Sequence, residues 1–138
     1  MVKFMAGKKG EGKTRKLIEM ANECAKVTDG HVVFIDDDKR HIFDLHRDIR
    51  FVEAGKGELA TYRELVGYIL GILSQNSDIN HIYIDGLSNI LENTVDNELL
   101  LKLKARLDSI GKTDQVEFVI SIHVEPDSLP VEIKATLV

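Results

Sequence analysis

The chain has a single cysteine, few prolines and no long apolar run. Because Cys24 is the only thiol among 138 residues, no disulfide can form within the chain, and its amphipathic surroundings favour a buried thiol in a reducing compartment. The most apolar stretch, residues 65–73, is about half as long as the roughly 20 residues that a membrane span needs, and no secretory leader is expected. These absences predict a cytoplasmic protein that does not cross a membrane.

The chain also lacks internal repeats, low-complexity tracts and proline-rich linkers. Its length suits one domain and is too short for two, so residues 1–138 are expected to fold as a single unit. Hydrophobic residues make up 43% of the chain and charged residues 30%, which is typical of globular domains and unlike disordered or fibrous proteins.

Acidic residues predominate overall, but positive charge is concentrated in one region. The formal net charge is −5, whereas residues 1–30 hold seven Lys or Arg against four Asp or Glu. A protein that binds a long polyanion usually has a basic balance, so the charge does not favour nucleic acid as a partner. A small basic site for a small anion is compatible with this distribution.

Apolar runs alternate with helical patterns along the chain. Runs typical of buried strands cover residues 2–6, 32–35, 81–85 and 117–123. Apolar residues recur at helical spacing in residues 17–25, 59–75 and 93–110. Alternation in residues 130–138 predicts an antiparallel edge strand. The pattern therefore indicates a three-layer α/β fold, with a mostly parallel sheet, helices on both faces, and ligands at the carboxyl ends of the strands.

The stretch GKKGEGKT, residues 7–14, follows the first predicted strand and precedes a helix. Its glycines let successive backbone amides turn inward around an anion, and the first helical turn adds unpaired amides. Lys13 is then placed to reach the outer phosphates of a nucleotide, and Thr14 to bind Mg²⁺ through its hydroxyl. We expect nucleotide contacts from Gly7, Lys9, Gly10, Glu11, Gly12, Lys13, Thr14 and Arg15. The alternative is a solvated loop of glycine and lysine that matches the pattern by chance.

Acidic residues end two of the predicted strands. Asp85 is placed to hold the Mg²⁺ shell directly or through water, or else only caps the following turn. One of Asp36, Asp37 and Asp38 can orient, or take a proton from, a water that attacks a γ-phosphate. The alternative for these three residues is an acid-rich helix N-terminus that favours the helix dipole.

His123 ends the strand predicted at residues 117–123, two positions after Ser121. A polar side chain at this edge can sense a γ-phosphate by hydrogen bonding, whereas the alternative is a surface histidine without a role. The other histidines show no metal-ligand spacing and are given no function; they are His31, His41, His46 and His81.

These residues together resemble the P-loop nucleoside triphosphatases, with GKKGEGKT similar to the Walker A motif and HIYID, residues 81–85, similar to the Walker B strand. The order of the motifs resembles the RecA-like ATPases, among which small KaiC-like proteins are the nearer comparison. FIDDD, residues 34–38, resembles the strand of that group that ends in an acid. The resemblance implies a water-orienting role for Asp38 and a sensor-like role for His123.

The same resemblance implies an ATP-binding protein with slow Mg²⁺-dependent ATP hydrolysis. Lys13, Asp38 and His123 would be its catalytic residues, and Thr14 and Asp85 its metal ligands. Hydrolysis is expected to be slow or absent because the family usually has glutamate where Asp38 stands. A homo-oligomer or a protein partner also fits, since RecA-like ATPases often hydrolyse well only when assembled. No added domain, DNA-binding loop or arginine finger is evident, so recombination is not implied.

Other functions remain compatible with the sequence. A regulatory module that binds a nucleotide without turnover is suggested by the departure at Asp38. A small-molecule kinase would share the phosphate loop, although the six arginines form no clustered lid. A small GTPase is disfavoured, because residues 111–114 only partly resemble a guanine-reading segment and precede a strand instead of following one.

Overall fold

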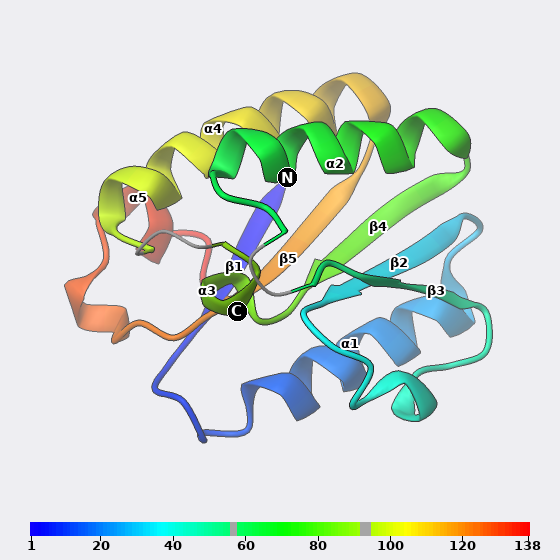
Figure 1. Ribbon diagram of the computed structural model, residues 1–138, viewed down its shortest axis with the longest axis horizontal. Helices are drawn as coiled ribbons and strands as arrows, with labels where there is room; N and C mark the ends of the chain where they lie inside the picture. The colour runs from blue at the N-terminus through cyan, green and yellow to red at the C-terminus, as the bar shows by residue number, and fades with distance from the viewer. Residues whose placement is uncertain (56–57, 92–94) are drawn as a thin grey trace.

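The computed structural model describes residues 1–55, 58–91 and 95–138. Its centre is a five-stranded sheet in which all strands run parallel, in the order β1-β5-β4-β2-β3 (Figure 1). The strands are β1 (Val2–Ala6), β2 (His31–Asp36), β3 (Ile49–Glu53), β4 (Ile79–Ile84) and β5 (Glu117–Ile122). The four predicted strands are confirmed, and β3 adds a fifth strand at one edge.

Helices and short turns connect the strands. The helices are α1 (Lys13–Val27), α2 (Tyr62–Gln75), α3 (Leu87–Ile90), α4 (Asn97–Asp114) and α5 (Val131–Lys134), and the 3₁₀ turns are η1 (Ile42–Asp44) and η2 (Pro126–Ser128). Side-chain oxygens of Thr61 and Asp96 cap α2 and α4, each accepting a hydrogen bond from a backbone N–H three residues later. None of the described helices combines the length and the apolar content that crossing a bilayer requires.

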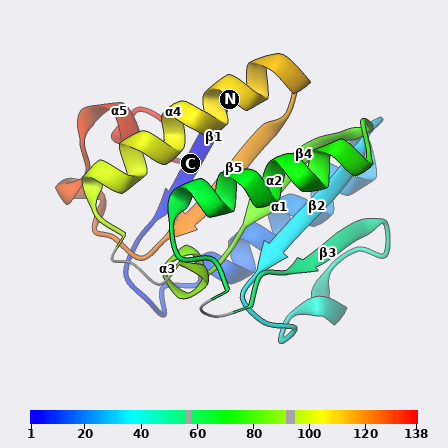
Figure 2. The same ribbon diagram turned by 45° about the horizontal axis from the view of Figure 1, so that its top comes forward.

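The helices cover both faces of the sheet, which gives three layers. Helices α2 and α4 lie side by side over one face, and α1 covers the other (Figures 1 and 2). In β2, Val33 and Ile35 belong to the core under α2 and α4, whereas Val32 and Phe34 belong to the core under α1. Because both faces of the strand are buried, its sequence is a continuous apolar run without alternation.

The end of α4 differs from the sequence-based expectation. Helix α4 runs past Gly111 and ends at Asp114, where Gln115 adopts the left-handed conformation with φ 57° and closes the helix. The expected helix start at residue 93 lies outside the described residues.

The predicted antiparallel strand at residues 130–138 is wrong. Pro130 leads into the short helix α5, in which Ile133 is fully buried while Val131 is 74% exposed. Leu137 then forms a single parallel bridge with Phe4 of β1. Alternation over so few residues does not distinguish a strand from a helical turn. In this segment the chain forms a helical turn that buries Ile133.

Candidate functional site

The carboxyl ends of four strands meet at one edge of the sheet, because β1, β5, β4 and β2 are neighbours in parallel register. Between the segments that follow them lies a pocket of about 280 Å³. It is lined by Lys9, Gly10, Thr14, Asp36, Asp37, Asp38, Arg40, His41, Asp85, Gly86, Asn89 and His123. The fold therefore brings together eight candidate residues from the sequence, namely Lys9, Gly10, Thr14, Asp36, Asp37, Asp38, Asp85 and His123.

The glycine-rich loop between β1 and α1 turns through left-handed backbone conformations. Gly10 has φ 89° and Gly12 has φ 81°, values that residues with a side chain rarely adopt. Gly12 directly precedes α1, and no side chain caps the first turn of this helix. The backbone N–H groups of that turn are thus available to an anion, which the helix dipole also favours.

Lys13, the first residue of α1, is the buried cation of the site. Its side chain is 6% exposed, and its Nζ donates hydrogen bonds to the carbonyl oxygens of Gly7 at 2.9 Å and Lys8 at 2.7 Å. Burial lowers the pKa of the Lys13 ammonium, against the opposing effect of Glu11 and Asp85. Among the described residues, no carboxylate forms an ion pair with it.

Two buried carboxylates face this edge from neighbouring strands. Asp36 ends β2 and is 3% exposed, whereas Asp85 follows β4 and is 5% exposed. The Asp85 carboxylate accepts a hydrogen bond from the hydroxyl of Ser121, and Asp36 Oδ1 accepts one from the Asp37 backbone N–H at 2.7 Å. Burial, followed by the effects of Asp37 and Asp85, raises the pKa of Asp36 to about 8.

The donor set of the pocket suits Mg²⁺, which prefers oxygen ligands. Thr14 offers a hydroxyl oxygen, and Asp36 and Asp85 offer carboxylate oxygens in the same pocket. Potential ligand oxygens of Asp36, Asp37 and Asp38 also lie within 4.8 Å of one another. Crowded, buried carboxylates repel one another, so a divalent cation here would relieve the cost of their charge.

Asp38 lies in the turn after β2 and is bound to Arg40. Its Oδ1 accepts a hydrogen bond from the Arg40 backbone N–H at 2.9 Å, and its Oδ2 lies 2.8 Å from an Arg40 guanidinium nitrogen. The hydrogen bonds from Arg40 lower the pKa of Asp38. A carboxylate held in this way is a weak base, which limits how well it can take a proton from water.

His123 follows β5 and forms part of the pocket wall. Partial desolvation, with a smaller contribution from the Lys13 charge, lowers the pKa of this histidine. Its imidazole is therefore neutral at pH 7 and suited to hydrogen bonding with an anion through its N–H.

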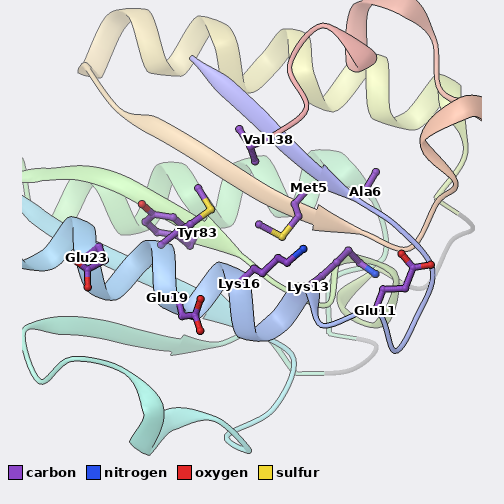
Figure 3. Close-up of a pocket in the computed structure, with 10 residues that line it drawn as sticks. Met5, Ala6, Glu11, Lys13, Lys16, Glu19, Glu23, Tyr83 and Val138 are labelled. Carbon is purple, nitrogen blue, oxygen red and sulfur yellow. The ribbon is translucent and has the colours of Figure 1, made fainter.

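Five of the expected nucleotide contacts do not line this pocket; they are Gly7, Glu11, Gly12, Lys13 and Arg15. The Glu11 carboxylate folds back against Gly7, where a Cβ would lie only 2.8 Å from its Oε2. Glu11 and Lys13 line a separate hollow between α1 and β1 (Figure 3). Gly12, Lys13 and Arg15 line a third hollow, on the side of α1 that faces η1, which shares Gly10, Thr14 and His123 with the pocket. Arg15 pairs with Glu19 at 3.3 Å.

Some residues of the pocket were not singled out from the sequence as functional. Arg40 and Asn89 were not considered, and Asp36 was a candidate only together with Asp37 and Asp38, although it is the most buried of the three. A signal for Asp36 exists, because it is the residue at which the apolar run of β2 ends. No comparable pattern marks Arg40, in the turn after β2, or Asn89, in the short helix α3.

No protein-family model matches the chain, and no curated protein is significantly similar to it in sequence. The function is therefore argued from the residues of the site.

Proposed function

We propose that this protein binds a nucleoside triphosphate together with Mg²⁺ and hydrolyses it slowly, with ATP as the expected nucleotide and a RecA-like P-loop core. The observation that carries the proposal is the meeting, in one pocket, of a glycine-rich loop, the Thr14 hydroxyl and two buried carboxylates from separate strands. An anion-binding loop beside a pair of acids suits a ligand that brings both phosphate and a divalent cation.

Each residue has a distinct part in this proposal. The loop amides and the first turn of α1 would hold phosphate oxygens, and Lys13 would exchange its carbonyl partners for an outer phosphate. Thr14 and Asp85 would hold Mg²⁺, which neutralises phosphate charge when bound. His123 would donate a hydrogen bond to the γ-phosphate.

A nucleotide-binding regulatory module without turnover is the second candidate. The observation that favours it is the pairing of Asp38 with Arg40, because this pairing lowers the pKa of the carboxylate that would orient the attacking water. Binding is common to both candidates, and only the rate of phosphate release separates them.

Calorimetry with ATP, ADP and GTP, each with Mg²⁺, tests the proposal. We expect the wild type to bind a nucleotide and Lys13→Ala to bind it at least about 100-fold more weakly, because the buried cation is lost. Lys26→Ala, in the last turn of α1, is the matched control and should bind normally. Absence of binding of any nucleotide by the folded wild type would refute the proposal.

Phosphate release then separates the two candidates. Slow Mg²⁺-dependent release that falls in Asp38→Asn, with binding retained, would support hydrolysis. Binding without release would favour the regulatory module, and an unchanged rate in Asp38→Asn would remove the catalytic role of that residue.

A further inference from the structure

Asn89, in the short helix α3, brings an unused side-chain amide to the candidate pocket. It lines the pocket together with Lys9, Gly10 and Thr14, which belong to the glycine-rich loop and the start of α1. Within the part of the chain that the structure describes, this amide has no hydrogen-bond partner. Its oxygen has two lone pairs and can therefore accept a hydrogen bond from a molecule that enters the pocket.

The carboxylates of the pocket are already engaged. Asp38 is held by the backbone and the guanidinium of Arg40, and Asp36 accepts a hydrogen bond from the backbone N–H that follows it. The Asp85 carboxylate accepts a hydrogen bond from the Ser121 hydroxyl and is assigned to Mg²⁺ in the proposed function. An acceptor that stays available to an attacking water is therefore a neutral one.

Helix α3 fixes the backbone that carries Asn89. Leu87 and Ile90 of the same turn are 1% and 0% exposed, so they anchor α3 in the core. The backbone N–H groups of Asn89 and Ile90 both donate to the Gly86 carbonyl at 2.9 Å. A side chain on an anchored turn can hold a small molecule in one place at a low cost in conformational entropy.

Gly86 brings α3 close to the acidic end of β2. Its φ is 72°, and a Cβ at this position would lie only 2.8 Å from Asp37 Oδ1, so a residue with a side chain would hold the two segments apart. Helix α3 lies at the carboxyl end of the sheet, where the loop between β1 and α1 also lies (Figures 1 and 2). Both segments line the pocket, so a γ-phosphate held by the loop would lie between the loop and α3.

We propose that the Asn89 amide oxygen accepts a hydrogen bond from the water that attacks the γ-phosphate and so sets the position of that water. This role rests on the proposed function, because it concerns how the bound nucleotide is hydrolysed. The water oxygen forms a bond to the γ-phosphorus, while the bond from that phosphorus to the β–γ bridging oxygen breaks and its electron pair leaves with ADP. One proton of the water stays on the released hydrogen phosphate, and the other goes to solvent.

A neutral amide suits this role because phosphoryl transfer depends more on position than on base strength. Its transition state is loose, so the nucleophile needs orientation and little removal of its proton. The amide oxygen has no net charge and does not repel the phosphate as a further carboxylate would. Hydrolysis can then proceed slowly even while Asp38 is bound to Arg40.

Binding of two phosphate mimics, each with ADP and Mg²⁺, tests the proposal without turnover. Aluminium tetrafluoride mimics the planar transition state with its attacking water, whereas beryllium trifluoride mimics the γ-phosphate before attack. Asn89→Leu keeps the size of the side chain but removes the acceptor. It should weaken the aluminium complex about tenfold and leave the affinity of the beryllium complex within about twofold. Ser88→Ala, at the exposed neighbouring position that does not line the pocket, is the matched control and should change neither complex.

Steady-state phosphate release gives a second measurement. Asn89→Leu should lower kcat about tenfold without changing KM, and Asn89→Gln, which keeps an amide oxygen, should recover part of the rate. If the wild type binds nucleotide but releases no phosphate, the two mimics alone decide.

Three results would overturn the water-positioning role of Asn89. They are an aluminium complex that is equally tight in Asn89→Leu and the wild type, an equal loss of affinity for both mimics, and a wild type that forms the beryllium complex but no aluminium complex. A folded wild type that binds no nucleotide would instead refute the proposed function, and this role with it.

Discussion

The two halves of the candidate site bury opposite charges and satisfy them in different ways. On the β1 side, the Lys13 ammonium is held by two backbone carbonyl oxygens. On the β2 and β4 side, Asp36 and Asp85 lie close enough for one to raise the pKa of the other. Neutral carbonyl oxygens satisfy the buried charge of the basic half, whereas a raised pKa of Asp36 lowers the negative charge of the acidic half.

Asp85→Asn is expected to have the largest effect on Mg²⁺ binding. Loss of the carboxylate should weaken Mg²⁺ binding in the presence of nucleotide by about 100-fold, because an amide oxygen carries no net charge. Titration of Mg²⁺ against a fluorescent nucleotide measures this change. Equal Mg²⁺ affinity in the variant and the wild type would show that Asp85 only caps the turn.

A smaller change is expected from Ser121→Ala, which removes the hydrogen bond to Asp85. The carboxylate would lose its orientation but keep its charge, so Mg²⁺ affinity should fall by about tenfold. Ser109→Ala, at an exposed position of α4, is the control for the serine change itself. Unaltered Mg²⁺ binding in Ser121→Ala would mean that this bond serves only the packing of β4 and β5.

Asp36→Asn should stabilise the protein at alkaline pH. The pKa of Asp36 is about 8 in the folded chain, whereas an unfolded aspartate has a pKa of about 3.9, so the folded state holds an extra proton between these values. The free energy of unfolding of the wild type therefore falls as pH rises from about 4 to 8. Asparagine does not titrate, and from these two pKa values the variant should be more stable by several kcal/mol at pH 8.

Denaturant unfolding at several pH values, without Mg²⁺ or nucleotide, measures this difference. The gain in stability should vanish below about pH 4, where the wild-type carboxyl is protonated in both states. Parallel pH profiles of the two proteins would contradict the inferred proton on Asp36.

The smallest effect is expected from Arg40→Ala. Arg40 is exposed, so its loss should leave the free energy of unfolding within about 0.5 kcal/mol of the wild type. Without the guanidinium, the pKa of Asp38 should rise toward its ordinary value, and phosphate release should change by a few-fold. A large loss of stability would instead assign a structural role to the Asp38–Arg40 pair.

Much of the site follows from the sequence because its residues stand at the ends of apolar runs. Thr14, Asp85 and His123 follow three different strands, and parallel strands deliver such residues to one edge. The direction of each side chain depends on contacts that no local pattern encodes. Glu11 folds against Gly7 and Arg15 pairs with Glu19, so neither lines the pocket where it was expected.

Burial separates Asp36 from its neighbours in a way that the sequence does not reveal. Asp36, Asp37 and Asp38 are chemically alike, but only Asp36 belongs to β2 and is sealed by the adjacent strands. The C-terminal segment shows the same limit for secondary structure, since its alternating pattern predicted a strand and the chain formed α5. In both regions tertiary packing decided between choices that were locally equivalent.

The position of β1 in the sheet also affects the order in which the chain folds during its synthesis. Val2 of β1 pairs with Phe118 of β5, and among the described residues the one further bridge to β1 comes from Leu137. During synthesis β1 precedes β5, its neighbour in the sheet, so the strand that leads into the glycine-rich loop cannot join the sheet until β5 has emerged. The pocket at the carboxyl ends of the strands should therefore form late, after β5 has been made.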